Sequence, residues 1–449
     1  MGGGILQLVG AAAAGFRGAH PADRCAKDEC GDHDHGAGHS PPPRPCREAR
    51  PLNAPLEGVA GAGYFRTNLL SEGVTMAPRR PAGADAFPRK TVEPFATRPA
   101  EDGPLYAALD LGTNSCRMLI ARPAGSQFQV VDSFSKPVQL GHGLEASGRL
   151  SRPSMARTVH ALQVCRRKLE AHQVTRMRLV ATEACRRARN SRDFLRMIRR
   201  ETGLPVEIID AEEEARLAVI SCAPLVSQRT EQLLVVDIGG GSTELVWIDL
   251  EDVEPKERSR AIMRLGDGFR DPLPGGARVV DWISVPLGVA TLRDQFEDVE
   301  DDQGRFALMS WHFEEMLADF APYALAQTME EGFQIIGTSG TVTTVAASHL
   351  GLRRYDRTKV DGLIMSSAQI DRVIRDYLSL GPEGRRADPR IGRERHALIM
   401  SGAAILQTLM RVWPTTRLSV ADRGLREGLL YAQMVKDGVL APDGMNGVA

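Results

Sequence analysis

Two stretches of the chain, Leu105-Tyr-Ala-Ala-Leu-Asp110-Leu-Gly-Thr-Asn-Ser115 and Leu233-Leu-Val-Val-Asp237-Ile-Gly-Gly-Gly-Ser-Thr243, share one order of residue types. Each starts with an apolar run that predicts a buried strand, reaches an Asp, and ends in a turn of glycine and small polar residues. A returning strand is expected after each turn, over 116–121 and 244–248. This internal repeat predicts two related α/β domains.

An Asp at the end of a buried strand, followed by glycine and hydroxyl residues, suits the binding of phosphate. Glycine lets the backbone approach an anion closely, and the N–H and hydroxyl groups of such a turn can donate hydrogen bonds. Either turn alone could equally be a tight hairpin, but a third Gly/Thr-rich loop over 337–341 favours phosphate binding. The candidates are Gly112, Thr113, Asn114, Ser115, Gly239, Gly240, Gly241, Ser242, Thr243, Gly340 and Thr341.

Around the repeats, the period of the apolar residues predicts helices that alternate with strands in a mixed sheet. The first domain is expected over 104–229 and the second over 230–422, with a closing helix within 423–440 that packs back on the first. Further strands are expected over 128–134, 179–181, 206–209, 334–336 and 418–420. Helices are expected after the N-cap Ser151, over 182–200, after Asp210 and over 399–409.

Residues 1–103 differ from the rest of the chain in composition. They are crowded with Gly, Ala, Pro, Arg and His and show no strand or helix period. Such a segment buries too little apolar surface to offset its chain entropy, so we expect it to be disordered. Its cysteines and histidines match no zinc-finger spacing, and Met76 is an alternative start of the protein.

Composition limits the partners of the chain. The 56 basic and 57 acidic residues nearly cancel, which leaves a formal net charge of -1 and no global field for nucleic acid. No apolar run approaches the roughly 20 residues that cross a bilayer. Seven cysteines without a CxxC pair fit free thiols in a reducing compartment, so a cytoplasmic location is expected. A homodimer is compatible with the sequence, which does not determine the oligomeric state.

Further motifs resemble one family. The two turns are similar to the phosphate loops of the superfamily of actin, sugar kinases and chaperone ATPases. The motifs that resemble the exopolyphosphatase/guanosine pentaphosphate phosphohydrolase (Ppx/GppA) family are Ala181-Thr-Glu-Ala-Cys-Arg-Arg-Ala188, Glu213-Glu-Ala-Arg216, Gly337-Thr-Ser-Gly-Thr341 and Asp422-Arg-Gly-Leu-Arg-Glu-Gly428. The resemblance implies two RNase H-like domains of the actin-like ATPase type, with mixed sheets around an interdomain cleft.

The same resemblance implies roles for single residues. Glu214 matches the carboxylate that positions and deprotonates the attacking water, and Arg186 matches an arginine that grips a substrate phosphate. Asp237 and Glu244 match an acidic pair implicated in Mg²⁺ binding, with Asp110 facing them. From the residues alone, Glu214 could simply be one of three acidic side chains favoured by the helix dipole, and Glu244 a surface carboxylate.

The implied reaction is the Mg²⁺-assisted hydrolysis of terminal phosphates from inorganic polyphosphate. Guanosine pentaphosphate is the alternative substrate, and a non-catalytic sensor of polyphosphate or an alarmone is a further alternative. Gln139 stands where the family usually has Arg, and Asp361 where His is common. Because these changes remove positive or titratable character near the cleft, and no C-terminal helical domains follow, we expect short or medium chains to be preferred.

Overall fold

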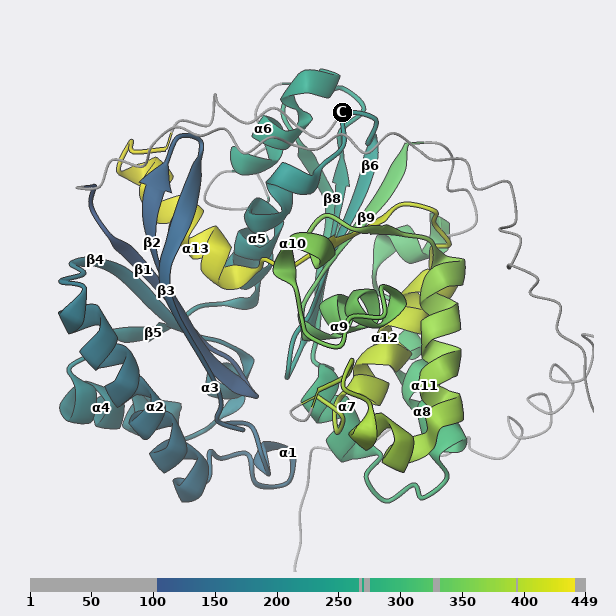
Figure 1. Ribbon diagram of the computed structural model, residues 1–449, viewed down its shortest axis with the longest axis horizontal. Helices are drawn as coiled ribbons and strands as arrows, with labels where there is room; N and C mark the ends of the chain where they lie inside the picture. Colours follow the sequence, from purple (N-terminus) through teal and green to yellow (C-terminus); the bar gives the residue numbers. More distant parts are fainter. Residues whose placement is uncertain (1–102, 266–268, 270–274, 326–331, 393–394, 441–449) are drawn as a thin grey trace, which may run out of the picture. The chain divides into compact units, whose positions relative to one another are not determined.

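The computed structural model describes residues 103–265, 269, 275–325, 332–392 and 395–440. Residues 1–102 of the segment that the sequence predicts to be disordered therefore lie outside the described residues. The described part contains two mixed sheets with helices packed against them (Figure 1).

The first sheet has the strand order β3-β2-β1-β4-β5. Its strands are β1 (Tyr106–Leu111), β2 (Ser115–Ala124), β3 (Gln127–Pro137), β4 (Arg176–Ala181) and β5 (Val206–Ile208). The first three strands pair antiparallel, whereas β4 and β5 add parallel to β1. The helices that follow in the chain are α1 (Leu144–Ser147), α2 (Arg152–Ala171), α3 (Glu183–Arg187), α4 (Ser191–Thr202) and α5 (Ala211–Cys222), with the 3-10 turn η1 (Ala223–Leu225).

The second sheet repeats this plan with the order β10-β11-β9-β6-β7-β8. Its strands are β6 (Gln232–Ile238), β7 (Thr243–Asp249), β8 (Arg278–Val285), β9 (Phe333–Thr338), β10 (Ile364–Met365) and β11 (Leu418–Ala421). Strands β6, β7 and β8 pair antiparallel, and β9 and β11 add parallel to β6. The accompanying helices are η2 (Pro255–Glu257), α6 (Arg258–Met263), α7 (Val289–Gln295), α8 (Asp302–Glu315), η3 (Ala321–Leu325), α9 (Gly340–His349), α10 (Arg357–Val360), α11 (Ser367–Ala387), α12 (Ile399–Val412) and α13 (Leu425–Lys436).

The shared strand order confirms the predicted fold class of two RNase H-like domains. Helices α2 and α4 cover one face of the first sheet, and α8, α9, α11 and α12 cover one face of the second. Helices α5 and α13 lie between the two sheets, where α13 contacts β1 and α5 contacts β6 and β7 (Figure 1). No helix among the described residues has the length and apolar character needed to cross a membrane.

The helix predicted over 182–200 is wrong in one respect, because it is interrupted. Helix α3 ends at Arg187, Ala188 is extended with φ −76° and ψ 124°, and α4 starts at Ser191. The Asn190 side chain ties the segment between the two helices to Leu150. It accepts a hydrogen bond from the Leu150 N–H at 2.8 Å and donates to the Leu150 carbonyl at 3.0 Å. The predicted N-cap Ser151 is confirmed, and the helix predicted after Asp210 has Asp210 as its N-cap, since both side chains accept a backbone N–H of the first helical turn.

The contact between α5 and α13 predicts a sensitive position at Gly428. A Cβ atom added there would lie 2.0 Å from the Leu217 carbonyl oxygen, which belongs to the backbone of α5. Gly428→Ala should therefore lower the free energy of unfolding by about 2 kcal/mol or more, although alanine is the better helix former. Gly384→Ala in α11 is the control, because its nearest neighbour would be the Leu380 Cβ at 3.1 Å and no backbone atom would lie as close as in Gly428→Ala. Equal denaturant midpoints for the two variants would contradict this packing.

Candidate active site

A cavity of about 260 Å³ lies where loops from both sheets meet. The turn after β1, the turn after β6, the N-terminus of α9 and the turn between β11 and α13 all line it. Glu214 enters the cavity from the first turn of α5. The repeated strand ends therefore place the two predicted phosphate loops in one site.

The two loops touch each other, and glycine makes the contact possible. A Cβ atom on Gly241 would lie 2.4 Å from the Thr113 hydroxyl oxygen, and one on Gly240 would lie 3.2 Å from the Asn114 backbone nitrogen. Any side chain at Gly241 would have to push the first loop away. The glycines of the second loop thus let its backbone lie close to the first loop, and they also let it lie close to a bound anion.

The third wall of the cavity is the N-terminus of α9. Ser339 has φ 117°, in the left-handed region that L-residues rarely adopt, and its side chain accepts a hydrogen bond from the Thr341 N–H at 3.2 Å. Ser339, Gly340 and Thr341 all line the cavity. Because the free N–H groups and the dipole of a helix N-terminus favour anions, this wall suits a phosphate.

Carboxylates gather at the bottom of the site. Burial, followed by repulsion from Glu214 and Asp110, raises the pKa of Asp237 to about 7. Burial and the Asp237 charge raise the pKa of Glu244 to about 7. Burial, then the Glu244 charge, raises the pKa of Glu214 well above its ordinary value, and burial raises the pKa of Asp110. The cluster therefore lacks full charge compensation and would gain from a bound cation.

Glu214 is held by an arginine and still has a free oxygen. Its Oε2 accepts a hydrogen bond from Nη1 of Arg186 at 2.7 Å, and the same nitrogen donates to the Ile209 carbonyl at 3.1 Å. Arg186 also contacts Glu183, so its guanidinium bridges two carboxylates. Within the described residues, no hydrogen bond or ion pair reaches Oε1 of Glu214, which can accept a proton from water.

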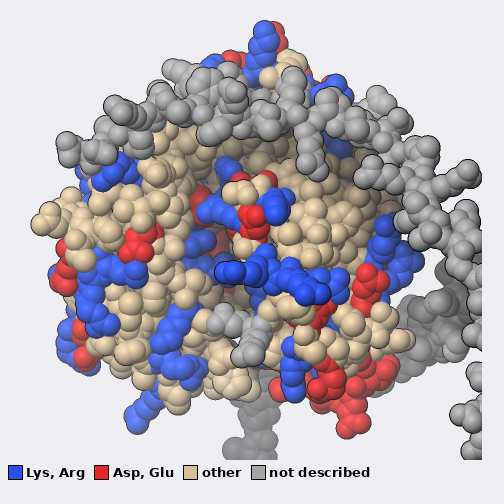
Figure 2. Space-filling view, in the orientation of Figure 1, with Lys and Arg blue, Asp and Glu red and all other residues tan. Residues whose placement is uncertain are grey.

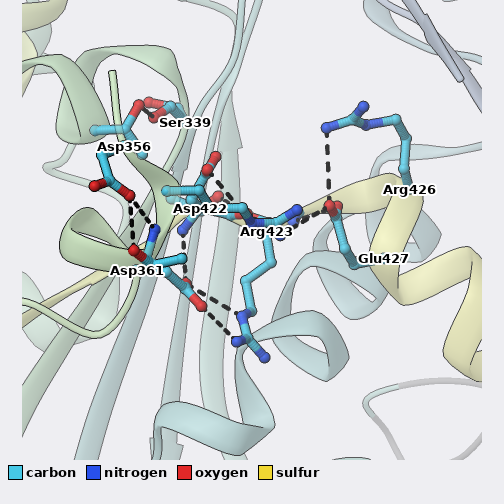
Figure 3. A network of polar contacts seen from close by, with 12 residues as sticks. Ser339, Asp356, Asp361, Asp422, Arg423, Arg426 and Glu427 are labelled. Atoms are coloured by element: carbon cyan, nitrogen blue, oxygen red, sulfur yellow. Dashed lines mark hydrogen bonds and ion pairs between the residues drawn. The ribbon is translucent and has the colours of Figure 1, made fainter. Parts of the chain in front are cut away.

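Four arginines also line the cavity: Arg117, Arg395, Arg423 and Arg426. Arg423 donates to both carboxylate oxygens of Asp361, at 3.2 and 2.5 Å (Figure 3). Arg395 donates to the Gly340 carbonyl at 3.1 Å, and Arg426 lies 3.8 Å from Glu427. Three of these cations are thus partly committed to protein acceptors.

Arg117 differs from the other three. Its Nε is buried without a hydrogen-bond partner, and the described residues offer its guanidinium no ion pair. Burial lowers its pKa, and Arg426 is the next cause. An arginine that lines a cavity with unused donors is a suitable contact for a substrate phosphate.

The sequence prediction missed Arg117, although a signal was present. Arg117 pairs across the strands with Asp110, as Glu244 pairs with Asp237. Each partner comes seven residues after its Asp, so the internal repeat links the two positions. Arg395, Arg423 and Arg426 gave no comparable signal, because loops far apart in the sequence bring them to the cavity.

Most of the predicted site residues meet in the cavity. Those that line it are Asp110, Gly112, Thr113, Asn114, Ser115, Glu214, Asp237, Gly239, Gly240, Gly241, Ser242, Gly340 and Thr341. Thr243, Glu244 and Arg186 stand behind this surface. The Thr243 hydroxyl donates to the Leu287 carbonyl at 2.7 Å, and Glu244 accepts a hydrogen bond from Ser284 at 2.9 Å.

The carboxylates at the cavity suit Mg²⁺ better than a metal ion whose ligands all come from the protein. Among the residues that the structure describes, no group of three or more His, Cys, Asp or Glu side chains could hold a metal ion. Mg²⁺ usually keeps several waters and is bound by one or two carboxylates together with substrate phosphates. Of the three predicted metal ligands, Asp110 and Asp237 line the cavity and could do so, whereas Glu244 does not line it.

The class of protein follows from comparison with known families. The profile of the Ppx/GppA phosphatase family matches residues 119–437, which include most of both domains. The chain therefore belongs to the Ppx/GppA phosphatase family.

Solved structures agree with this assignment. The crystal structure of the Aquifex aeolicus member of the family is 27% identical, with a TM-score of 0.58, and the match covers 74% of this chain and 98% of that one. An exopolyphosphatase-like protein is also 27% identical, with a TM-score of 0.61 and coverage of 73% and 97%. An exopolyphosphatase from Cytophaga hutchinsonii is 22% identical, with a TM-score of 0.61 and coverage of 74% and 98%, which shows a shared fold.

The raised pKa of Asp237 leads to a prediction about stability. Between the ordinary pKa near 4 and the folded value of about 7, the folded protein binds more protons than the unfolded chain, so this group's contribution to stability falls as pH rises. In EDTA, Asp237→Asn should therefore become more stable relative to wild type from pH 5 to pH 8, by at least about 1 kcal/mol.

Magnesium should reverse that difference at pH 8, because it would stabilise the wild type by binding the carboxylates. Melting curves with EDTA and with Mg²⁺ measure both effects. Asp252→Asn, at an exposed position, is the control. A relative stability of Asp237→Asn that does not change with pH would contradict the charge repulsion inferred for this cluster.

Proposed function

We propose that the chain is an exopolyphosphatase, which hydrolyses the terminal phosphate of inorganic polyphosphate with Mg²⁺ as cofactor. The observation that carries this proposal is the position of Glu214: its carboxylate enters a cavity walled by two phosphate loops and a helix N-terminus. Membership of a phosphatase family supports hydrolysis as the reaction.

In the proposed reaction, Oε1 of Glu214 orients a water molecule and accepts its proton as the water oxygen attacks the terminal phosphorus. The bond from that phosphorus to the bridging oxygen breaks, and the shortened chain leaves with the bridging oxygen. Arg186 holds Glu214 through Oε2 and favours its charged form. A carboxylate used in this way typically contributes about 10²–10⁴-fold to the rate.

The other groups neutralise and position the phosphates, which is most of what phosphoryl transfer requires. Both loops and the α9 N-terminus line the cavity and would supply backbone N–H groups to the anion, and Arg117 supplies a cation that has no ion pair within the described residues. Bound Mg²⁺, held by Asp110 and Asp237, would neutralise charge on the phosphate oxygens and offset the repulsion among the carboxylates.

Guanosine pentaphosphate is the second candidate substrate, and one observation favours it. The Tyr355 side chain is 47% exposed, and the guanidinium carbon of Arg395 lies 6.0 Å from the centre of its ring. Because Arg395 lines the cavity, a purine could stack on Tyr355 while the phosphates enter the site. A non-catalytic sensor is the remaining alternative, and the retained carboxylates argue against it.

Phosphate release from tripolyphosphate, from polyphosphates of increasing length and from guanosine pentaphosphate, measured together with Mg²⁺, tests the proposal. We expect kcat/KM to be highest for polyphosphate of short or medium length. If guanosine pentaphosphate is hydrolysed faster than every polyphosphate, the second candidate is the correct one. If the folded protein binds these compounds and releases no phosphate, it is a sensor.

Glu214→Gln should lower kcat by roughly 10²–10⁴-fold, because it removes the base and keeps a side chain of the same shape. Its melting temperature and its affinity for substrate should stay close to those of wild type. Glu213→Gln is the matched control, since Glu213 pairs with Arg178 at 2.6 Å and does not line the cavity. Normal turnover by Glu214→Gln would exclude Glu214 as the base.

A further inference from the structure

The end of the connection between α9 and α10 and the first residues of α10 carry a high density of positive charge. This segment has the sequence Arg353-Arg354-Tyr355-Asp356-Arg357-Thr358-Lys359, with four cations and one carboxylate in seven residues, in a chain whose net charge is only -1. We call these four residues, Arg353, Arg354, Arg357 and Lys359, the basic strip. Figure 2 shows Lys and Arg side chains gathered at the centre of the face on which Figure 1 places α9 and α10.

Three of the four charges of the basic strip are available to a ligand, whereas Arg357 contacts Asp422 and Glu427. All four side chains are exposed. Within the described part of the chain, Arg353 and Arg354 form no hydrogen bond or ion pair. Lys359 contacts only Asp356, at 3.4 Å, and its side chain is 61% exposed. Exposed ion pairs of this kind are worth little, so an anionic ligand can displace them.

The basic strip is continuous with the rim of the cavity. Arg357 donates to the Asp422 carbonyl at 2.5 Å, and its Nε lies 3.5 Å from the Asp422 carboxylate. Asp422 lines the cavity, and the Tyr355 hydroxyl lies against its carboxylate. Figure 3 shows Asp422 between Asp356 on one side and Arg423 on the other. An anion that leaves the cavity past Asp422 therefore meets Arg357, and the other three residues of the strip lie within four residues of Arg357 in the chain.

A linear polyphosphate has the matching chemistry. Every unit carries negative charge, and only the end of a long chain fits a cavity of about 260 Å³. The remaining units must lie on the surface, where cations without strong partners would lower their electrostatic energy and attract the chain from solution. An uncharged purine would gain from the Tyr355 ring and much less from four cations.

We propose that the basic strip binds the phosphates of a polyphosphate chain that lie outside the cavity, and so raises kcat/KM with chain length only up to the length that spans its four cations. This inference rests on the proposed function and deepens it. The strip is a substrate-binding surface and takes no part in the chemical step, which occurs at the terminal phosphate inside the cavity.

The test compares Arg353→Gln/Arg354→Gln with Arg192→Gln/Arg199→Gln. The second pair removes two exposed arginines from α4, in the first domain and away from the cavity lining. With long-chain polyphosphate, the strip variant should lose roughly 3- to 20-fold in kcat/KM at low salt, mainly through KM, and the loss should shrink as salt is added. With tripolyphosphate, both variants should stay within about twofold of wild type.

Each contrary result overturns the proposal in its own way. Equal losses for tripolyphosphate and for the long chain would show that the strip acts on the cavity. An equal loss of kcat/KM in the control variant would show that the effect comes from the net charge of the protein and not from the strip. A loss confined to guanosine pentaphosphate would assign the strip to nucleotide binding.

A binding measurement tests this inference separately from the proposed function. Binding of labelled long-chain polyphosphate to the full-length proteins is measured in EDTA, where no turnover is required. If wild type binds the long chain and the strip variant binds it more weakly than the control variant, the strip is a polyphosphate surface even if no phosphate is released. If both variants bind as well as wild type, the proposal fails although the enzyme is active.

Discussion

The burial of several carboxylates at one cavity is the constraint on which this site depends. Asp110, Glu214 and Asp237 line the same space, and Glu244 stands directly behind them. Burial is the largest cause of the raised pKa of each group, and for Glu214, Asp237 and Glu244 the charge of a neighbouring carboxylate adds to it. Arg186 compensates Glu214, and Arg117 compensates Asp110 and Asp237. A cation that arrives with the substrate would complete the balance.

Duplication of the fold explains how such a site arises. Five strands of the second sheet repeat the order of the first, and β10 is an additional edge strand, so both sheets bring an Asp and a glycine-containing turn to the same kind of position. The residue opposite each Asp has diverged, to Arg117 in the first domain and Glu244 in the second. One domain thus contributes a cation where the other contributes a further carboxylate. The two loops then meet through Gly240 and Gly241, which places both sets of groups around one substrate.

Much of this arrangement could be predicted from the sequence, because it depends on local patterns. The apolar runs before Asp110 and Asp237 are β1 and β6, and Asp210 is the N-cap of α5, which positions Glu214. The rest depends on contacts between distant segments. Asn190 interrupts a helical pattern through Leu150, forty residues away, and Arg423 is turned by Asp361. Such tertiary hydrogen bonds override local propensity and leave no periodic signal. The orientation of Thr243 toward Leu287 was equally unpredictable, since either face of β7 could have met the loop.

The central claim is that this cavity transfers a terminal phosphate to water. The most direct measurement is the reaction with polyphosphate and Mg²⁺ in water enriched in a heavy oxygen isotope, followed by mass spectrometry of the products. Each released orthophosphate should carry a single oxygen atom from the solvent, and the remaining chain should shorten one unit at a time without gaining the isotope. Intact chains that stay bound, or phosphate that appears on another acceptor without solvent oxygen, would contradict this claim.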